Sequence, residues 1–152
     1  MIDGSDFSFE RGTDGPRVIV APIDGSTTSL RAVSYAAGLA RRQSAQLVVI
    51  FVCSSSPMTG IVPEAGVLFT DAQHEVAQEL RQQVAEGACR SGIRARFIET
   101  KGDPYTEISR ICDEVLADSV IVGASTSAGH RIVGSLGVRL VRAGRWPVTV
   151  VP

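Results

Sequence analysis

Apolar residues are distributed along this chain in two ways. Five short runs are rich in Val and Ile, and the longer segments between them place apolar residues at every third or fourth position. Near-continuous apolar runs are typical of strands buried on both faces of a parallel sheet, and the longer period is typical of amphipathic helices. The pattern predicts strands at 17–23, 46–52, 94–99, 118–123 and 148–151. The run at 94–99 alternates, which favours a place near a sheet edge.

Capping residues mark where the intervening helices begin. A serine, threonine or aspartate stands at each expected start, and Pro104 suits the first turn of a helix. The second helix continues to about Ser91 and stops at Gly92. The segment 53–70 contains Ser, Pro and Gly, so we expect a long connection there, of a length that is often functional or mobile. The predicted helices begin at Ser26 or Thr27, Asp71, Pro104 and Ser135.

Strands that alternate with helices predict an α/β fold. We expect a three-layer α/β/α sandwich around a five-stranded parallel sheet with right-handed crossovers. The 152 residues suit one domain. Residues 1–16 show little periodicity, so we expect a flexible N-terminal tail before a folded domain at 17–152. Ligands in such folds bind outside the carboxyl ends of the strands.

The charge and hydropathy of the chain give no indication of nucleic-acid binding, secretion or membrane insertion. Fifteen basic and sixteen acidic side chains leave a formal net charge of -1, which gives no sign of a nucleic-acid partner. The N-terminus is acidic and polar, unlike a secretory signal, and the longest apolar run, 47–53, is too short to cross a bilayer. We therefore expect a soluble, cytoplasmic protein with no membrane partner.

The cysteines and histidines show no spacing typical of a metal site or a disulfide framework. No carboxylate or nucleophile stands beside His130 in the sequence, so we predict no catalytic residue and no metal ligand. These residues are Cys53, Cys89, Cys112, His74 and His130.

The segment 117–140 combines a predicted strand end, a loop of small and hydroxylated residues, and a predicted helix start. Gly123 and Gly129 allow the backbone a positive φ or a close approach to a ligand. Ser135 can cap the helix that follows, and the free N–H groups of its first turn favour an anion. The segment indicates a phosphate-binding loop. An ordinary βα connection with a serine N-cap is the alternative.

Motifs in a fixed order resemble the universal stress protein family over Arg17 to Pro152. They are PIDGS after the first strand, the end of the second strand at Val52, KGDPYTEI before the third helix, and a glycine loop ending in Gly134-Ser135. The resemblance implies the adenine nucleotide alpha hydrolase-like fold with strand order 3-2-1-4-5. It also implies a homodimer through the last strand, Val148 to Val151, and, in one branch of the family, bound ATP with Mg²⁺.

The resemblance also assigns site residues. In the ATP-binding branch a P-x-D pattern recognises adenine, and it is matched here by Pro22, Ile23 and Asp24. A carboxylate facing the exocyclic amine beside a β-branched wall also suits adenine chemically. The family's phosphate loop is G-x2-G-x9-G-S/T, whose first and last positions are matched here. The predicted nucleotide-binding residues are Pro22, Ile23, Asp24, Val52, Gly102, Gly123, Ser125, Gly129, Arg131, Gly134 and Ser135.

The loop of this chain is two residues shorter than the family pattern. Its first and last glycines are 134 − 123 = 11 positions apart, and Thr126 stands where the second glycine would be. Gly129 can replace that glycine, or hydroxyl groups with His130 and Arg131 can line a reshaped loop.

Two functions follow from these observations. The first is a stress-response regulatory module that binds ATP or a related adenine nucleotide as a homodimer, with slow ATP hydrolysis at most. The second is a nucleotide-free stress adaptor that acts through protein partners of unknown identity. The hydroxyl run at 26–29 also resembles a flavodoxin-type phosphate loop, but aromatic residues that would hold a flavin are scarce, at 5%.

Overall fold

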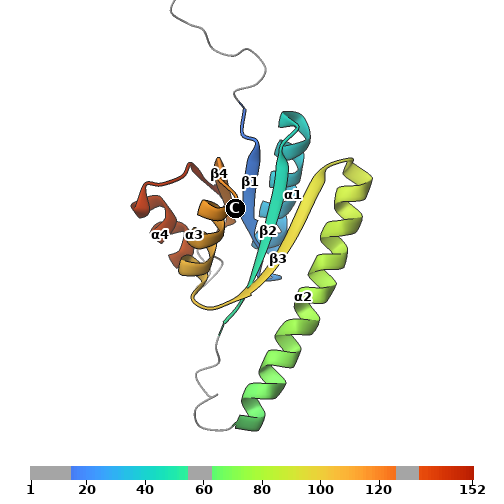
Figure 1. Ribbon diagram of the computed structural model, residues 1–152, viewed down its shortest axis with the longest axis vertical. Helices are drawn as coiled ribbons and strands as arrows, with labels where there is room; N and C mark the ends of the chain where they lie inside the picture. Colours follow the sequence, from blue (N-terminus) through green and yellow to red (C-terminus); the bar gives the residue numbers. More distant parts are fainter. Residues whose placement is uncertain (1–14, 55–62, 126–133) are drawn as a thin grey trace, which may run out of the picture.

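The computed structural model describes residues 15–54, 63–125 and 134–152 of the chain. Within these ranges five strands alternate with four helices, which confirms the predicted fold class (Figure 1). The strands are β1 (Val18–Pro22), β2 (Gln46–Cys53), β3 (Arg94–Lys101), β4 (Ser119–Gly123) and β5 (Val148–Val151). The helices are α1 (Thr27–Gln43), α2 (Pro63–Ser91), α3 (Pro104–Glu114) and α4 (Ser135–Ala143).

The five strands form one parallel sheet in the order β3-β2-β1-β4-β5, as the resemblance implied. β1 lies at the centre, where Val20 pairs with Val48 of β2 on one side and with Val120 of β4 on the other. After β1 the chain forms β2 and β3 on one side of it, and then crosses to form β4 and β5 on the other side. This reversal of strand order beside β1 opens a crevice at the carboxyl ends of β1 and β4. β3 lies at an edge, as its alternating pattern predicted.

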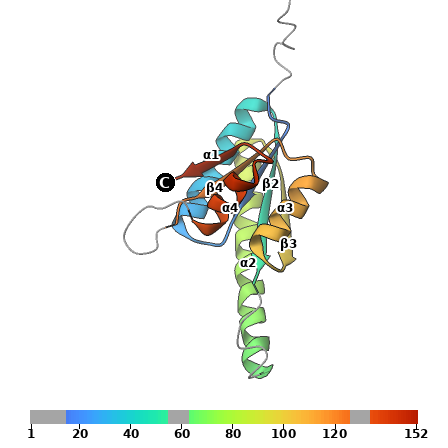
Figure 2. The same cartoon turned by 90° about the vertical axis from the view of Figure 1, so that its left-hand side faces the viewer.

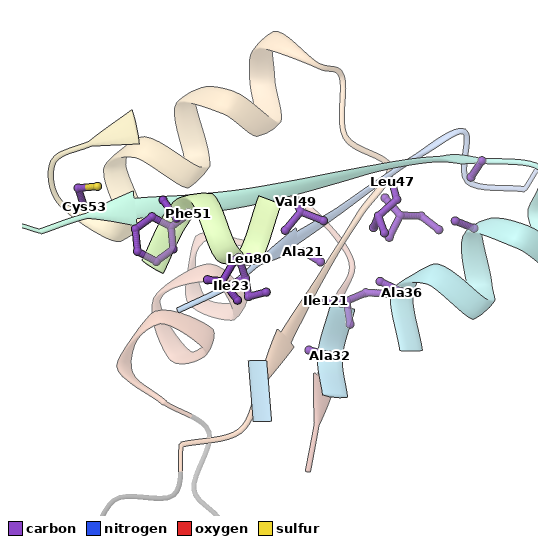
Figure 3. Close-up of a cluster of buried hydrophobic side chains, with 14 residues drawn as sticks. Ala21, Ile23, Ala32, Ala36, Leu47, Val49, Phe51, Cys53, Leu80 and Ile121 are labelled. Atoms are coloured by element: carbon purple, nitrogen blue, oxygen red, sulfur yellow. The ribbon is translucent and has the colours of Figure 1, made fainter. Parts of the chain in front are cut away.

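The helices form a layer on each face of the sheet (Figures 1 and 2). α1 and α2 cover one face, where Ala36 and Leu80 pack with Leu47 in the cluster drawn in Figure 3. α3 and α4 cover the other face, where Ile111 and Leu140 pack with neighbouring strand residues. Successive strand residues therefore enter opposite cores, which explains why the apolar runs are continuous.

The first helix is fixed close to the sheet by small residues. The Ser26 hydroxyl accepts a hydrogen bond from the backbone N–H of Ser29 at 3.2 Å, which makes Ser26 the N-cap. Ala32, Ala36 and Ala40 then form a buried stripe at helical spacing. Because alanine side chains are short, the backbone of α1 can approach β1 and β4 closely. This places the N-terminus of α1 at the crevice.

The second helix corrects one prediction. It begins at Pro63 rather than Asp71, so the part of the expected long connection from residue 63 to 70 is helical. Proline fits the first position of a helix, and the following residues continue α2 beyond the sheet (Figure 1). Val67 and Leu68 are 60% and 71% exposed, because this part of α2 has no sheet to cover. The apolar residues there lack a helical period facing a core, so the sequence pattern did not reveal the helix.

Some predictions lie wholly or largely outside the described residues. These are the tail at 1–16, of which only positions 15 and 16 are described, and the calls on Gly129 and Arg131. Although α2 has 29 residues, no helix of the described ranges carries an apolar stretch that would cross a membrane.

Candidate functional site

A cavity of about 400 Å³ lies at the carboxyl ends of β1, β2 and β4. Its walls come from five separate parts of the chain: the β1–α1 turn, the end of β2, the start of α3, and the two segments that flank 126–133. This volume is in the range of small-ligand sites. The cavity is lined by Pro22, Ile23, Asp24, Ser26, Thr28, Ser29, Ile50, Val52, Pro104, Ile108, Val122, Gly123, Ala124, Ser125, Gly134, Ser135, Leu136 and Gly137.

Asp24 follows β1 and begins the turn into α1. Its Oδ1 atom accepts a hydrogen bond from the backbone N–H of Ser26 at 2.9 Å, and its own N–H donates to the Ser29 hydroxyl at 3.3 Å. Burial raises the pKa of Asp24, but hydrogen bonds from Ser26 and Ser29 outweigh this and hold it below its ordinary value. Asp24 is therefore a carboxylate at neutral pH, and it stabilises the local turn whether or not a ligand is bound.

Gly123 lies at the end of β4, directly against the start of α1. A Cβ atom built on Gly123 would lie 2.5 Å from the carbonyl carbon of Thr28 and 2.7 Å from the backbone nitrogen of Ser29. Real Cβ atoms do not approach backbone this closely, so only glycine fits between strand and helix. The close packing of α1 against β4 is thus enough to explain why position 123 is a glycine. Thr28 and Ser29, which Gly123 contacts, also line the cavity.

The two ends of the glycine loop lie side by side. A Cβ atom on Gly134 would be 3.3 Å from the Cβ atom of Ser125, so these residues are neighbours across the loop. The close approach means that the loop's ends reach the cavity together despite its shorter length. The sequence prediction that Ser135 is the N-cap is wrong. Gly134, with φ −59° and ψ 162°, is the N-cap of α4, and among the described residues no side chain caps the helix.

In the part of the chain that the structure describes, no side chain accepts from the first backbone N–H groups of α4. In α4 these groups belong to the turn that begins at Ser135, and Leu136 and Gly137 of that turn line the cavity. The unpaired N–H groups and the helix dipole favour negative charge at this end. The wall therefore has the chemistry of an anion site even with glycine at the cap.

The opposite wall is apolar. Ile50, Val52 and Val122 project from the strands, and Ile108 covers them from α3. A flat apolar ring suits such a wall, while its polar edge suits the carboxylate and hydroxyl groups at the β1–α1 turn.

Most predicted site residues meet in this cavity. Gly102 does not line it; its N–H instead donates to the Cys53 carbonyl at 3.1 Å, and Pro104, two positions on, forms the wall. Gly129 and Arg131 lie outside the described residues. The prediction missed the wall residues Ser26, Thr28, Ser29, Ile50, Pro104, Ile108, Val122, Ala124, Leu136 and Gly137. The hydroxyl run at 26–29 was the available signal for the first three.

A parallel sheet in this order, with a cavity at the reversal of strand order, defines the adenine nucleotide alpha hydrolase-like class of α/β fold. The chain belongs to the Universal stress protein family, whose family model matches residues 16–152. Universal stress protein MJ0531 of Methanocaldococcus jannaschii is 29% identical over 136 residues, which cover 88% of this chain and 80% of that protein.

Two solved structures show the same fold with bound nucleotides. A universal stress protein in complex with cAMP has a TM-score of 0.69 and 22% identity, covering 91% of this chain and 98% of its own. The universal stress protein from Archaeoglobus fulgidus in complex with dAMP has a TM-score of 0.64 and 17% identity, covering 92% and 99%. Identities this low show a shared fold alone.

Proposed function

We propose that this chain binds an adenine nucleotide in the cavity at the carboxyl ends of β1, β2 and β4. The observation that carries the proposal is the convergence of Asp24, Val52 and Gly123 with Ser125 and Gly134-Ser135 in one cavity, although these residues are far apart in sequence. The complexes of two structural neighbours with cAMP and dAMP support an adenine nucleotide as the ligand class.

The chemistry of the walls suggests how the nucleotide lies. The adenine ring packs on Val52 and Ile50, with its exocyclic amine donating to Asp24, whose carboxylate is ionised at neutral pH. The phosphate groups then face the start of α4, where backbone N–H groups and the Ser135 hydroxyl can donate to them. Gly129 and Arg131 remain predicted members of the same site.

ATP with Mg²⁺ is the specific ligand that we propose on the family resemblance. No group of three or more His, Cys, Asp or Glu side chains suited to a metal occurs in the part of the chain that the structure describes. This fits Mg²⁺ that is carried by phosphate oxygens and water, since Mg²⁺ keeps several waters and needs few protein ligands. The role proposed is regulatory, with slow hydrolysis at most.

Thermal unfolding with added nucleotide tests the binding proposal. A ligand at 100 times its dissociation constant stabilises by about 2.7 kcal/mol, which corresponds to roughly 5–10 °C for a domain of this size. We expect this shift with ATP and Mg²⁺ or with AMP, and a smaller one with GTP, whose base lacks the exocyclic amine at the position facing Asp24. No shift at millimolar adenine nucleotide would contradict the proposal and favour the nucleotide-free adaptor.

The homodimer is a further part of the proposal. β5 is short and apolar at one edge of the sheet, whereas β3 at the other edge carries Arg94, Arg96, Glu99 and Lys101. Charged side chains discourage edge pairing, so β5 is the edge suited to a second copy in an isologous antiparallel pair. Light scattering should give twice the mass of 16.1 kDa.

The exposed Thr149 offers a test of that pairing. Near the two-fold axis, Thr149→Lys would bring like charges together, so the variant should become a monomer with an unchanged circular dichroism spectrum. A wild-type monomer at micromolar concentration would contradict the dimer. We propose the cytoplasm as the place of action, which fractionation of cells would check.

A further inference from the structure

Two ion pairs between exposed side chains join α3 to the C-terminal part of the chain, one from the middle of α4 and one from the residue that follows its C-cap, Gly144. Arg139 lies 3.2 Å from Asp103, and Arg145 lies 2.6 Å from Asp113. Each arginine also lies over an aromatic ring: Arg139 is 4.2 Å from the centre of Tyr105, and Arg145 is 4.6 Å from that of Trp146. The two pairs are alike in chemistry and exposure, but only the first is next to the cavity.

Asp103 uses both of its carboxylate oxygens. Oδ2 caps α3, accepting from the backbone N–H of Thr106 at 3.0 Å and from its hydroxyl at 2.9 Å. Oδ1 accepts from Arg139 at 3.2 Å. The hydrogen bonds from Thr106 and then Arg139 hold the pKa of Asp103 below its ordinary value. The Asp103 side chain therefore links the start of α3 to the middle of α4.

The N-terminal turn of α4 is held by packing rather than by a cap. The helix is nine residues long, Gly137 and Leu140 are buried, Leu136 packs against the core of this face, and no side chain among the described residues caps it. Its turn 134–137 forms one wall of the cavity, and Pro104, next to Asp103, belongs to the other. Figure 2 shows α3 and α4 in the same layer, on the face of the sheet away from α1. The link at Asp103 thus lies where it can set the distance between the two walls.

We propose that Asp103 and Arg139 are positioning residues that hold α4 against α3, and so place the N–H groups of its first turn for the phosphate of the bound nucleotide. This inference rests on the proposed function. Neither side chain lines the cavity, so they act through the position of α4 rather than by touching the ligand.

The test compares Arg139→Gln and Asp103→Asn with a matched control, Arg145→Gln, in the full chain. Asparagine is a good N-cap, so Asp103→Asn keeps the start of α3. From the strength of exposed ion pairs, we expect both variants to weaken AMP and ATP binding about two- to fivefold by calorimetry. Arg145→Gln should leave the dissociation constant unchanged.

The two variants also distinguish a positioning role from a direct effect of side-chain charge on phosphate binding. If Arg139 acted only through its long-range field, removing it would weaken binding of a phosphate, but removing the negative charge of Asp103 would strengthen it. Under positioning both changes weaken binding, and the double variant is no worse than either single one. Tighter binding by Asp103→Asn would overturn the proposal, as would an equal loss in Arg145→Gln.

Hydrogen exchange without nucleotide gives an independent readout. The amide of Val138, which donates to the Gly134 carbonyl at 3.0 Å and so closes the first turn of α4, should exchange faster in Arg139→Gln than in the wild type or in Arg145→Gln, because this turn opens more often. If the wild type binds no nucleotide, the proposed function fails while this readout still decides whether the pair holds α4. Equal exchange in all three proteins would overturn the positioning role.

Discussion

Two cavities of similar size in the described part of the chain have different linings. The candidate site, about 400 Å³, combines Asp24, hydroxyl groups and the uncapped start of α4 with an apolar wall. The other, about 480 Å³, lies between α1 and α2 over β2 and β3. Aliphatic side chains such as Leu30, Val33 and Val84 line it together with Arg41, Glu86 and Arg90, which come from the two helices. The larger cavity follows from two helices packed side by side. The smaller one gathers polar groups from separate strand ends, which is what a ligand site requires.

Glycine has a different role in each cavity. Gly123, in the candidate site, has backbone atoms of α1 at its Cβ position, whereas Gly87, in the α1–α2 cavity, has nothing within 4 Å. Of these two glycines, only Gly123 lies where one backbone closely approaches another, and this approach shapes the candidate site. Substitution at these two positions therefore distinguishes a wall that depends on glycine from one that does not.

We expect the largest effect from Gly123→Ala. The added methyl group would overlap the backbone of Thr28 and Ser29, which should cost about 1–3 kcal/mol of unfolding free energy and move the start of α1. Gly87→Ala should instead stabilise by about 0.5–1 kcal/mol, since alanine is the better helix residue. Urea unfolding measures both. Equal stabilities for the two variants would contradict the packing described for Gly123.

Asp24→Asn should have the next largest effect, on nucleotide affinity. The asparagine can still accept from the N–H of Ser26, so the turn is kept, but the charged acceptor for the adenine amine is lost. Calorimetry should show binding about ten- to a hundredfold weaker. Glu86→Gln removes a carboxylate from the α1–α2 cavity and is the matched control, with no expected change. A similar loss in both variants would argue against a specific role for Asp24.

The same carboxylate predicts a pH dependence of stability. Because the folded-state pKa of Asp24 is lowered, its contribution is fully present above its unfolded-state pKa, about 4, and is lost as the pH falls through the folded-state pKa. The wild type should therefore lose stability relative to Asp24→Asn only below about pH 4. Urea unfolding at pH 7, 5 and 3 would check this. A difference that shrank already between pH 7 and 5 would show that another group is responsible.

The smallest expected effect concerns the thiols. Cys89 is exposed, whereas Cys53 and Cys112 are buried, and burial raises the pKa of Cys112 to about 12. A maleimide should therefore modify Cys89 alone in the native protein and all three cysteines after denaturation. Cys89 adjoins residues of the α1–α2 cavity, so the modified protein should bind nucleotide as well as the unmodified one. Reaction at Cys112 in the native state would show that the α3 face is more open than described.

The sequence predicted the sheet well and the details of the loops less well. Continuous apolar runs identify buried parallel strands because each strand faces two cores, and the alternating run identified the edge strand β3. The start of α2 was missed because Val67 and Leu68 face no core. The N-cap of α4 was placed at Ser135 on residue preference, whereas Gly134 takes the extended conformation of a cap. The link between Asp103 and Arg139 joins residues 36 apart, and no local pattern marks such a contact.

Nuclear magnetic resonance with labelled full-length protein tests the central claim most directly, because it reports which cavity responds to an adenine nucleotide. On titration with AMP or with ATP and Mg²⁺, we predict shifts at the amides of Asp24, Gly123, Ser125 and Ser135, and none at Val33 or Val84. Shifts gathered around α1 and α2, or no shift at millimolar nucleotide, would contradict the account.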